Sequence, residues 1–282
     1  MNYRHAFHAG NFADVVKHAV LARIIVHLKE KPAAFRVIDT HAGAGLYDLC
    51  GPEASRTGEW REGIGRLLAA QLSPGVHTLL APYLDAVAAL NPGGDMKLYP
   101  GSPALAQSLL RDQDRLVVCE WEPNAARALA AFVHGDARAK AVEIDGYTAL
   151  NAYVPPKERR GLVLIDPPYE QPDEFERLGQ ALAAAHRKWP TGIYALWYPI
   201  KNLRETAAFA RRIAASGIAR VLRAELTLAR ADSQRLGGSG LILVNPPWRL
   251  EQELSVLMPA LAQSLGAAAA GTARIDWLVP EK

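Results

Sequence analysis

Short apolar runs separated by longer helical patterns are the feature that most constrains the fold of this chain. Runs rich in valine, isoleucine and leucine that alternate with helices are typical of a mostly parallel sheet covered by helices on both faces. The sequence therefore predicts an α/β fold with a seven-stranded sheet. The predicted strands occupy residues 35–39, 116–120, 141–144, 162–166, 193–198, 220–228 and 241–245.

Capping patterns mark where several predicted helices begin. Ser102-Pro103 has the form of an N-cap followed by a first-turn proline, and Asp173 with Glu176 has the form of a capping box. A further, amphipathic helix is predicted over residues 13–29. On this helix we expect Lys17 on the solvated face, with contact to a cofactor carboxylate as the alternative.

An excess of residues separates the first two predicted strands. A strand–helix–strand unit needs about 30 residues, whereas the first strand ends at Asp39 and the second begins near Leu116. Helical patterns around residues 60–70 and 77–90 lie in this excess, between Gly-Pro and Asn-Pro-Gly-Gly sequences that favour turns. We predict one domain over residues 1–282 that contains a helical insertion at residues 48–97.

Composition excludes several other classes of protein. With 50% hydrophobic and 22% charged residues among 282, the chain has the make-up of a folded globular protein. Its apolar stretches are too short or too interrupted to cross a bilayer, and the first 18 residues lack the apolar core of a secretory signal. Cys50 and Cys119 build neither a disulfide framework nor a four-ligand zinc site. We expect a cytoplasmic protein, and the net charge of +3 permits a nucleic-acid partner without requiring one.

The segment from Asp39 to Gly45 follows the first predicted strand and is suited to ligand binding. Gly43 and Gly45 allow the backbone to approach a nucleotide-like ligand and leave amide groups facing it. A dinucleotide fingerprint would need a third glycine where Asp48 stands, which disfavours NAD or FAD. A tight strand-to-helix turn is the alternative interpretation.

Acidic residues end two further strands. Glu120 ends the second, where a carboxylate in a doubly wound sheet accepts both ribose hydroxyls of a nucleoside cofactor. Asp145-Gly146 follows the third, where an acid reaches an adenine amino group. The alternatives are a solvated charge for Glu120 and a common Asp-Gly turn for Asp145-Gly146.

Asp166-Pro167-Pro168-Tyr169 follows the apolar fourth strand and is the most specific motif of the chain. A Pro-Pro turn at the carboxyl end of a central strand fixes the backbone and leaves carbonyl oxygens facing the cleft. A carboxylate and a carbonyl that accept the two N–H bonds of an exocyclic amine turn its lone pair out of the ring plane, toward an electrophile. Tyr169 is suited to stack on a base that has left its helix.

A second Pro-Pro sequence, Asn245-Pro246-Pro247-Trp248, competes with the first. Its amide oxygen also accepts a hydrogen bond from an amine. However, it follows the last predicted strand, after a glycine-rich segment at 237–240 that is typical of a hairpin. Asp166 instead ends a strand expected beside the first one, at the switch point where ligands bind. We assign residues 245–248 to structure or to the rim of the cleft.

Motifs along nearly the whole chain resemble those of one protein family. DTHAGAG with LVLIDPPY is similar to the S-adenosylmethionine-dependent amino-methyltransferases, and the full set resembles the RlmJ family of bacterial 23S ribosomal RNA adenine-N6 methyltransferases. Trp60 departs from this pattern, because tyrosine is expected there. The motifs are YRHAFHAGNFADVVKH at 3–18, DTHAGAG at 39–45, RTGEW at 56–60, YPGSP at 99–103, RRGLVLIDPPYE at 159–170, GIYALWYP at 192–199 and NPPW at 245–248.

This resemblance implies a Rossmann-like class I methyltransferase fold with a helical insertion, S-adenosylmethionine as cofactor and 23S ribosomal RNA as substrate. It also implies that Asp166 orients or deprotonates the adenine amine, with Pro167 and Tyr169 in the catalytic motif. Tyr3 and Tyr169 would contact the RNA. The predicted cofactor contacts are Lys17, His18, His41, Gly43, Gly45, Ser102, Glu120, Asp145, Gly146 and Asp166.

Histidines and basic residues allow further interpretations. The histidines at 5, 8, 18 and 41 lack the carboxylate or cysteine spacing of a zinc site, so we expect no metal. Aromatic contacts to unstacked RNA bases are expected from Tyr3, Tyr169 and Trp248. A basic rim for phosphates and solvated helix faces are both open explanations of Lys157 and of the arginines at 159, 160, 204, 211, 212, 220, 223, 230 and 235.

Three hypotheses follow. The first is a monomeric methyltransferase whose cofactor lies over the carboxyl ends of the first three strands and whose target adenine enters the pocket at residues 166–169. The second is a nucleic-acid-binding protein that keeps the fold without turnover, against which the acids Asp39, Glu120 and Asp166 speak. The third keeps the enzyme and changes the substrate to DNA adenine or cytosine, which the same pocket would accept.

Overall fold

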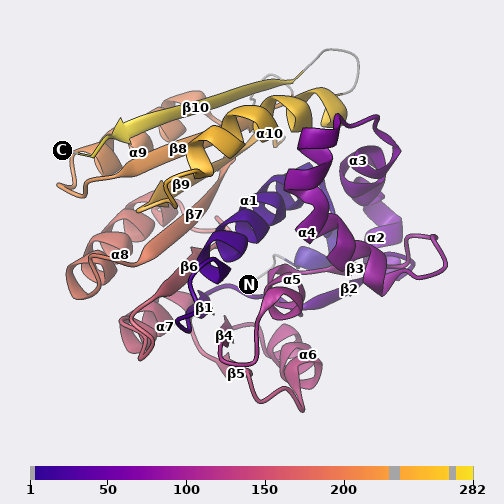
Figure 1. Cartoon of the computed structure of the whole chain (residues 1–282), viewed down its shortest axis with the longest axis horizontal. Helices are drawn as coiled ribbons and strands as arrows, with labels where there is room; N and C mark the ends of the chain where they lie inside the picture. The colour runs from indigo at the N-terminus through magenta and orange to yellow at the C-terminus, as the bar shows by residue number, and fades with distance from the viewer. Residues whose placement is uncertain (1–3, 229–235, 267–270, 282) are drawn as a thin grey trace.

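The computed structural model describes residues 4–228, 236–266 and 271–281, which are organised around one mixed sheet (Figure 1). The sheet has eight strands in the order β10-β8-β9-β7-β6-β1-β4-β5. The α/β class is confirmed, and strands of this sheet alternate with helices except where β9 follows β8 with no helix between them in the described residues. The strands are β1 (Arg36–Asp39), β4 (Arg115–Glu120), β5 (Ala139–Glu143), β6 (Gly161–Ile165), β7 (Ile193–Ile200), β8 (Val221–Thr227), β9 (Gly238–Val244) and β10 (Thr272–Val279).

The direction of the strands decides which loops meet. The five strands from β7 to β5 run parallel, whereas β9 is antiparallel to β7 and β8, and β10 is antiparallel to β8. The prediction of seven strands missed β10. The reason is physical: β10 is an edge strand of shallow burial that carries Arg274 and Asp276, so it lacks the continuous apolar run of strands covered on both faces.

Helices cover both faces of the sheet. One face shares an apolar core with α1 (Phe12–Lys29), α5 (Ser102–Leu109), α6 (Pro123–Val133) and α10 (Leu250–Leu265). The other packs against α7 (Gly146–Tyr153), α8 (Glu174–Lys188) and α9 (Leu203–Ala214), which lie together on the left and lower left of Figure 1.

Helix α1 is central rather than amphipathic. It contacts β6 and β9 of the sheet and also α4 (Pro74–Leu90), α5 and α10, so nearly all of its residues are buried. The prediction of a solvated face for Lys17 is therefore wrong, because that side chain is only 5% exposed. A lysine ammonium at such a position needs a compensating carboxylate.

A helical segment lies between two short strands that follow β1. The strands β2 (Leu46–Asp48) and β3 (Leu98–Pro100) pair antiparallel. Between them lie α2 (Pro52–Thr57), a π-helical turn η2 (Arg61–Gly65), α3 (Arg66–Ala69) and α4. The backbones of η2 and of the loop that leads into α1 touch, because Ile64 N donates to Gly10 O at 2.9 Å.

Two predicted caps differ from the observed ones. Gly101 takes the extended N-cap conformation before α5, so Ser102 is the first helical residue and its hydroxyl donates to Asp39 instead. Asp173 precedes α8, but its side chain makes no capping hydrogen bond, because its backbone (φ −96°, ψ 11°) is not extended as an N-cap requires. The glycine-rich segment at 237–240 leads into β9, which pairs antiparallel with β8 as expected of a hairpin, although residues 238–240 already belong to the strand.

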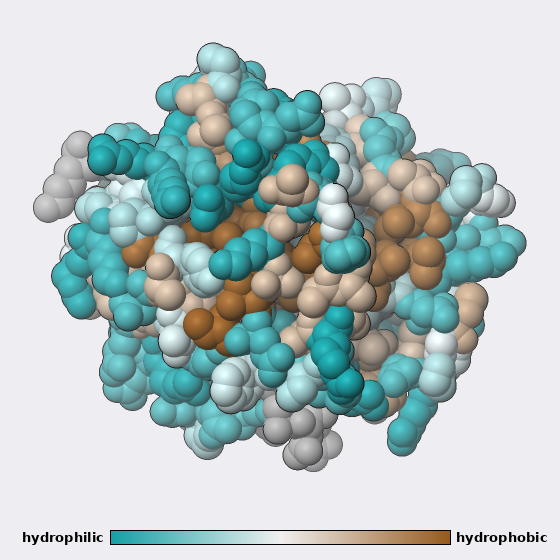
Figure 2. Space-filling model, turned by 90° about the horizontal axis from the view of Figure 1, so that it is seen from below, coloured by the Kyte–Doolittle hydropathy of each residue, from teal (hydrophilic) through white to brown (hydrophobic). Residues whose placement is uncertain are grey.

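Among the described residues, no helix is long and apolar enough to cross a bilayer. Seen from below, hydrophilic residues cover most of the molecule, and hydrophobic ones are visible in the central part of this face (Figure 2).

Candidate active site

A cavity of about 530 Å³ opens where the parallel strands end. The loops after β1, β4, β5 and β6 contribute to its wall, together with α1, the start of α5 and the start of α8. Because β1 lies between β6 and β4, this is the switch point at which doubly wound sheets bind ligands. The predicted site residues that line it are Lys17, His18, His41, Gly43, Ser102, Glu120, Asp145, Gly146, Asp166 and Pro167.

Of the two glycines after β1, only Gly43 reaches the cavity. It has a positive φ of 61°, and a Cβ there would lie 2.1 Å from the Tyr47 hydroxyl. Gly45 also has a positive φ, but it faces Phe132 of α6, 2.9 Å from where a Cβ would be. Gly45 therefore allows the loop to pack against a helix and is not part of the cavity wall.

Glu120 is held in place by backbone amides at the end of β4. Its Oε1 accepts from Trp121 N and Glu122 N, both at 2.8 Å, and its Oε2 accepts from Gly43 N at 2.8 Å. The neighbouring Trp121 ring is 61% exposed and also lines the cavity. A fixed carboxylate beside an open aromatic surface suits the ribose and base of a nucleoside.

Asp39 lies beneath the loop that follows β1. Its carboxylate accepts from the Ser102 hydroxyl at 2.6 Å and from His41 N at 3.3 Å. Burial raises the pKa of Asp39 to about 6 in spite of these hydrogen bonds. Because Asp39 does not line the cavity, it organises Ser102 and the loop rather than meeting a ligand.

His41 and Asp145-Gly146 form another part of the cavity wall. The His41 ring lies edge-on to Tyr147, with centroids 5.6 Å apart, and burial lowers its pKa to about 4, so the ring is neutral at neutral pH. A Cβ on Gly146 would lie 2.5 Å from this ring, so only glycine fits. The Asp145 carboxylate caps α7 by accepting from Thr148 N at 2.9 Å, the structural role expected of an Asp-Gly turn.

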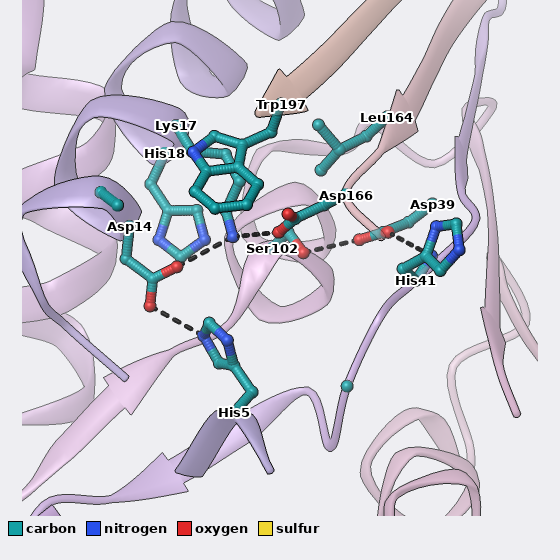
Figure 3. A network of polar contacts seen from close by, with 12 residues as sticks. His5, Asp14, Lys17, His18, Asp39, His41, Ser102, Leu164, Asp166 and Trp197 are labelled. Carbon is teal, nitrogen blue, oxygen red and sulfur yellow. Dashed lines mark hydrogen bonds and ion pairs between the residues drawn. The ribbon is translucent and has the colours of Figure 1, made fainter. Parts of the chain in front are cut away.

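Asp166 belongs to a buried network of charges (Figure 3). The Lys17 ammonium pairs with Asp166 Oδ2 and with Asp14 Oδ1, the latter at 2.9 Å. Asp14 Oδ2 also accepts from Gly10 N at 3.0 Å and lies 2.9 Å from His5 Nε2. Burial alone would lower the pKa of Lys17, but Asp14 and Asp166 hold it well above its usual value. Lysine is thus charged and bridges two carboxylates.

Tyr169 is placed beside the cavity rather than in its wall. Its backbone has a positive φ of 52°. Its ring packs against Phe175 at 5.1 Å and Trp197 at 5.7 Å between centroids, and its hydroxyl donates to Trp197 O at 2.8 Å. The stacking role expected for Tyr169 stays a prediction. Tyr3 lies outside the described residues.

His18 lines the cavity from α1 and is linked to the helical segment. Its Nδ1 lies 2.9 Å from the Tyr99 hydroxyl, which in turn lies 2.8 Å from the Tyr83 hydroxyl. Burial lowers the pKa of His18 to about 3, so this imidazole is neutral. A neutral ring on a tyrosine pair offers a hydrogen-bonding edge without adding charge.

Four residues of this region were not found by sequence reasoning. Asp14 lies three positions before Lys17, the spacing at which side chains meet on a helix, and this was an available signal. Tyr147, Glu174 and Arg177 line the cavity from α7 and α8. Of these three, only Tyr147 could have been inferred from the sequence, because it directly follows the predicted site residues Asp145-Gly146.

The second Pro-Pro sequence lies at the opposite end of the strands from the cavity, near the start of β7. Because β9 is antiparallel to β7, Asn245 emerges where β7 begins, and its amide donates to Pro190 O and Gly192 O, both at 2.8 Å. The structural role for residues 245–248 agrees with this position. The alternative that they lie at the rim of the cleft is wrong.

The residues considered for metal and phosphate binding are dispersed. The described part of the chain contains no group of three or more histidine, cysteine or acidic residues arranged to hold a metal ion. Arg223 is buried and pairs with Asp276 at 2.8 Å, and Arg160 donates to the backbone oxygens of Ala33 and Leu28. These two arginines therefore belong to the fold and not to a basic rim. Arg230 and Arg235 lie outside the described residues.

A Rossmann-like sheet in which Glu120 and an Asp-Pro-Pro turn line one cavity at the ends of the central strands, above a buried Asp39, is that of a methyltransferase. The chain belongs to the RlmJ family, since the model of the family described as "Ribosomal RNA large subunit methyltransferase D, RlmJ" matches residues 32–279. This confirms the resemblance of the motifs.

Relatives match over the full length of the chain. It is 42% identical over 282 residues to ribosomal RNA large subunit methyltransferase J of Escherichia coli K12, with both chains covered completely. It is 39% identical over 284 residues to the protein of the same name of Haemophilus influenzae Rd, again with complete coverage. Protein LPL1258 of Legionella pneumophila has a similar crystal structure, with a TM-score of 0.87, 33% identity, and coverage of 95% of this chain and 98% of that one.

Proposed function

We propose that this enzyme transfers a methyl group from S-adenosylmethionine to the exocyclic N6 of an adenine in 23S ribosomal RNA. The observation that carries the proposal is the position of Asp166-Pro167 in the wall of the same cavity that the fixed carboxylate of Glu120 lines. The names of the two full-length relatives support ribosomal RNA as the substrate.

The cavity supports a nucleoside cofactor at one end. Glu120 would accept the ribose hydroxyls, Trp121 would cover the base, and Asp145-Gly146 would meet the adenine amine. His18, His41, Gly43 and Ser102 would enclose the methionine part of the cofactor. Bound there, S-adenosylmethionine supplies an electrophilic methyl group on a sulfonium. Two neutral imidazoles suit a cationic cofactor better than two charged ones.

Asp166 would orient the attacking amine. Its Oδ2 pairs with Lys17, and within the described residues its Oδ1 takes no hydrogen bond, so Oδ1 is available to accept one N–H of the amine. A backbone carbonyl of the Pro-Pro turn would accept the other. These two contacts turn the nitrogen lone pair toward the methyl group, and positioning of this kind supplies most of the rate. Transfer would form the N–C bond as the bond between sulfur and the methyl carbon breaks, leaving a neutral thioether, and the nitrogen proton would pass to Asp166 or to water.

The test is transfer of tritiated methyl groups to ribosomal RNA from cells that lack this protein, with DNA in parallel and nucleoside analysis of the product. We expect labelled N6-methyladenine in 23S RNA alone. Asp166→Ala should abolish transfer and leave cofactor affinity largely intact. Asp173→Asn is the matched control, because this exposed aspartate near the motif makes no side-chain capping bond.

Other outcomes would favour the other hypotheses. Label in DNA would keep the chemistry and overturn the substrate. Tight RNA binding without any label would favour a protein that has kept the fold and lost turnover. Full activity of Asp166→Ala would refute the assignment of the acceptor.

Further parts of the proposal concern organisation and partners. The helical segment at 48–97 would act as an insertion subdomain within one domain, and the enzyme would act as a monomer without metal. Cytoplasm is the expected location, because ribosomal RNA is assembled there. Tyr3 and Tyr169 would contact the RNA, and Tyr169 would have to leave its contact with Trp197 to stack on the target base.

A further inference from the structure

Acidic side chains dominate the wall of the cavity, which is unfavourable for a polyanionic substrate. They are Glu120, Glu122, Asp145, Asp166, Glu170 and Glu174. Lysine and arginine contribute Lys17, Arg4 and Arg177. Lys17 is already bridged by two carboxylates, and Arg4 pairs with Glu53 at 3.5 Å. Within the described residues, Arg177 is therefore the cation of this wall that lies farthest from its acidic partner, Glu174, at 3.8 Å.

The guanidinium of Arg177 lies over an aromatic ring. Its central carbon is 4.7 Å from the centroid of Tyr147. The nearest carboxylate, of Glu174, is 3.8 Å away, beyond hydrogen-bond distance, and the guanidinium makes no hydrogen bond within the described residues. The side chain is 40% exposed. The contact with the Tyr147 ring thus restrains the guanidinium and leaves its N–H groups available for a ligand in the cavity that Arg177 lines.

The ring that carries Arg177 is itself fixed. The Tyr147 hydroxyl donates to Glu174 Oε1 at 2.5 Å, and Glu174 is 3% exposed. Tyr147 is the second residue of α7 and Glu174 is the first residue of α8, so the contact joins two helices at the cavity. A guanidinium on a rigid support loses little freedom when it binds a ligand.

We propose that Arg177 binds a backbone phosphate of the RNA strand beside the target nucleotide. The inference rests on the proposed function, because it takes RNA as the substrate. Its location supports a phosphate of the substrate: residues 166–168, 170 and 171 line the cavity between the Pro-Pro turn and α8, so Arg177 lies on the side of the catalytic motif. The planar fork of arginine matches phosphate oxygens in a bidentate manner.

The test measures RNA affinity over a series of salt concentrations with wild-type enzyme and Arg177→Ala. We expect Arg177→Ala to bind a 23S RNA fragment about 10-fold more weakly in low salt. The slope of log affinity against log salt should fall by about 0.7 to 1, the value for one phosphate contact. Arg177→Lys should keep most of the slope, because it keeps the charge.

Arg187→Ala is the matched control, since Arg187 is exposed on the same helix and lies outside the cavity wall. Cofactor affinity, measured by calorimetry, should be unchanged in all three variants. An unchanged salt slope in Arg177→Ala would overturn the inference. A loss of cofactor affinity with a normal slope would do so too, by assigning the guanidinium to the cofactor.

The inference and the proposed function fail in distinguishable ways. If wild-type enzyme neither methylates nor binds ribosomal RNA, the proposed function fails. If wild-type enzyme methylates RNA and Arg177→Ala keeps the wild-type slope, only the inference fails. Should Arg177→Ala prove unstable, Arg177→Gln keeps the side-chain length without the charge, and the same change in slope is expected of it.

Discussion

Lys17 carries a buried positive charge that two carboxylates share. A buried ammonium would be unfavourable alone, and so would two buried carboxylates close together. The contacts of the Lys17 ammonium with Asp14 and Asp166 compensate these charges. Burial raises the pKa of Asp14, whereas His5 and Lys17 lower it, and the net result lies well below the usual value. Asp14 thus influences how strongly the Lys17 ammonium pairs with the Asp166 carboxylate, although Asp14 does not line the cavity itself.

Asp14→Asn should reduce kcat about 10-fold and change cofactor affinity little. The amide still accepts from Gly10 N or Lys17, but without its charge the ammonium would pair more strongly with Asp166 and compete with the substrate amine. Single-turnover methyl transfer and cofactor titration measure the two effects separately. Asp85→Asn, at an exposed site on α4, is the control. Wild-type kcat in Asp14→Asn would contradict the role assigned to Asp14.

Residues at strand ends were predictable, whereas residues brought in by helices were not. Asp39, Glu120 and Asp166 follow apolar runs, and parallel strands bring their carboxyl ends to one edge. The contact between Lys17 and Asp166 spans 149 positions and depends on how α1 packs, which no local pattern encodes. The position of Arg177 and Glu174 in the cavity wall could not be predicted either, because in sequence they look like ordinary charged residues at the start of a helix.

At the scale of elements, backbone contact fixes the helical segment on α1. A Cβ on Gly63 would lie 2.1 Å from Gly10 O, a backbone atom that cannot move aside as a flexible side chain can. The segment therefore packs against the loop that leads into α1, close to His5 and Asp14. Glycine is required at position 63 because the two backbones approach each other closely, and not because φ is positive there.

Gly63→Ala should lower the free energy of unfolding by about 1–3 kcal/mol, the usual cost of overpacking. Gly75→Ala is the contrasting variant: Gly75 lies in the first turn of α4 and nothing lies within 4 Å of where its Cβ would be. It should stabilise by about 0.5–1 kcal/mol through helix propensity. Chemical denaturation measures both. Equal effects of the two substitutions would rule out close packing at Gly63.

The predicted elements failed mainly where burial is shallow or a turn is irregular. The central strands were found because apolar runs covered on both faces are easy to recognise. The edge strand β10 and the three-residue β2 and β3 had no such runs. The capping box at Asp173 has the correct residue types, but the backbone there is not extended, which residue types alone do not reveal.

At the scale of the whole molecule, α1 connects the cavity to the opposite end of the fold. Its first half holds the charges around Asp166. Its second half pairs with α10, because Glu253 accepts from Arg23 at 2.8 and 2.7 Å and lies 3.0 Å from His27. Burial would raise the pKa of Glu253, but His27 and Arg23 lower it to about 2.

Glu253→Gln should therefore destabilise the protein by roughly 2 kcal/mol at neutral pH, after allowance for solvent screening. The folded pKa is depressed, so the stabilisation is fully present above the ordinary pKa of 4.5 and disappears as pH falls through about 2. Unfolding curves of both proteins should converge as pH falls from 5 to 2. A constant difference over this range would show that the charge of Glu253 is not the cause.

Strand direction has a consequence for reading sequences of this kind. The chain contains two near-identical apolar runs, each followed by Pro-Pro and an aromatic residue, and a search for those letters alone would count two reactive centres. One run forms β6, so its proline pair lies at the cavity. The other forms β9, which runs in the opposite direction, so its proline pair lies at the opposite end of the strands. Whether such a tetrapeptide performs chemistry is therefore decided by the orientation of the strand before it.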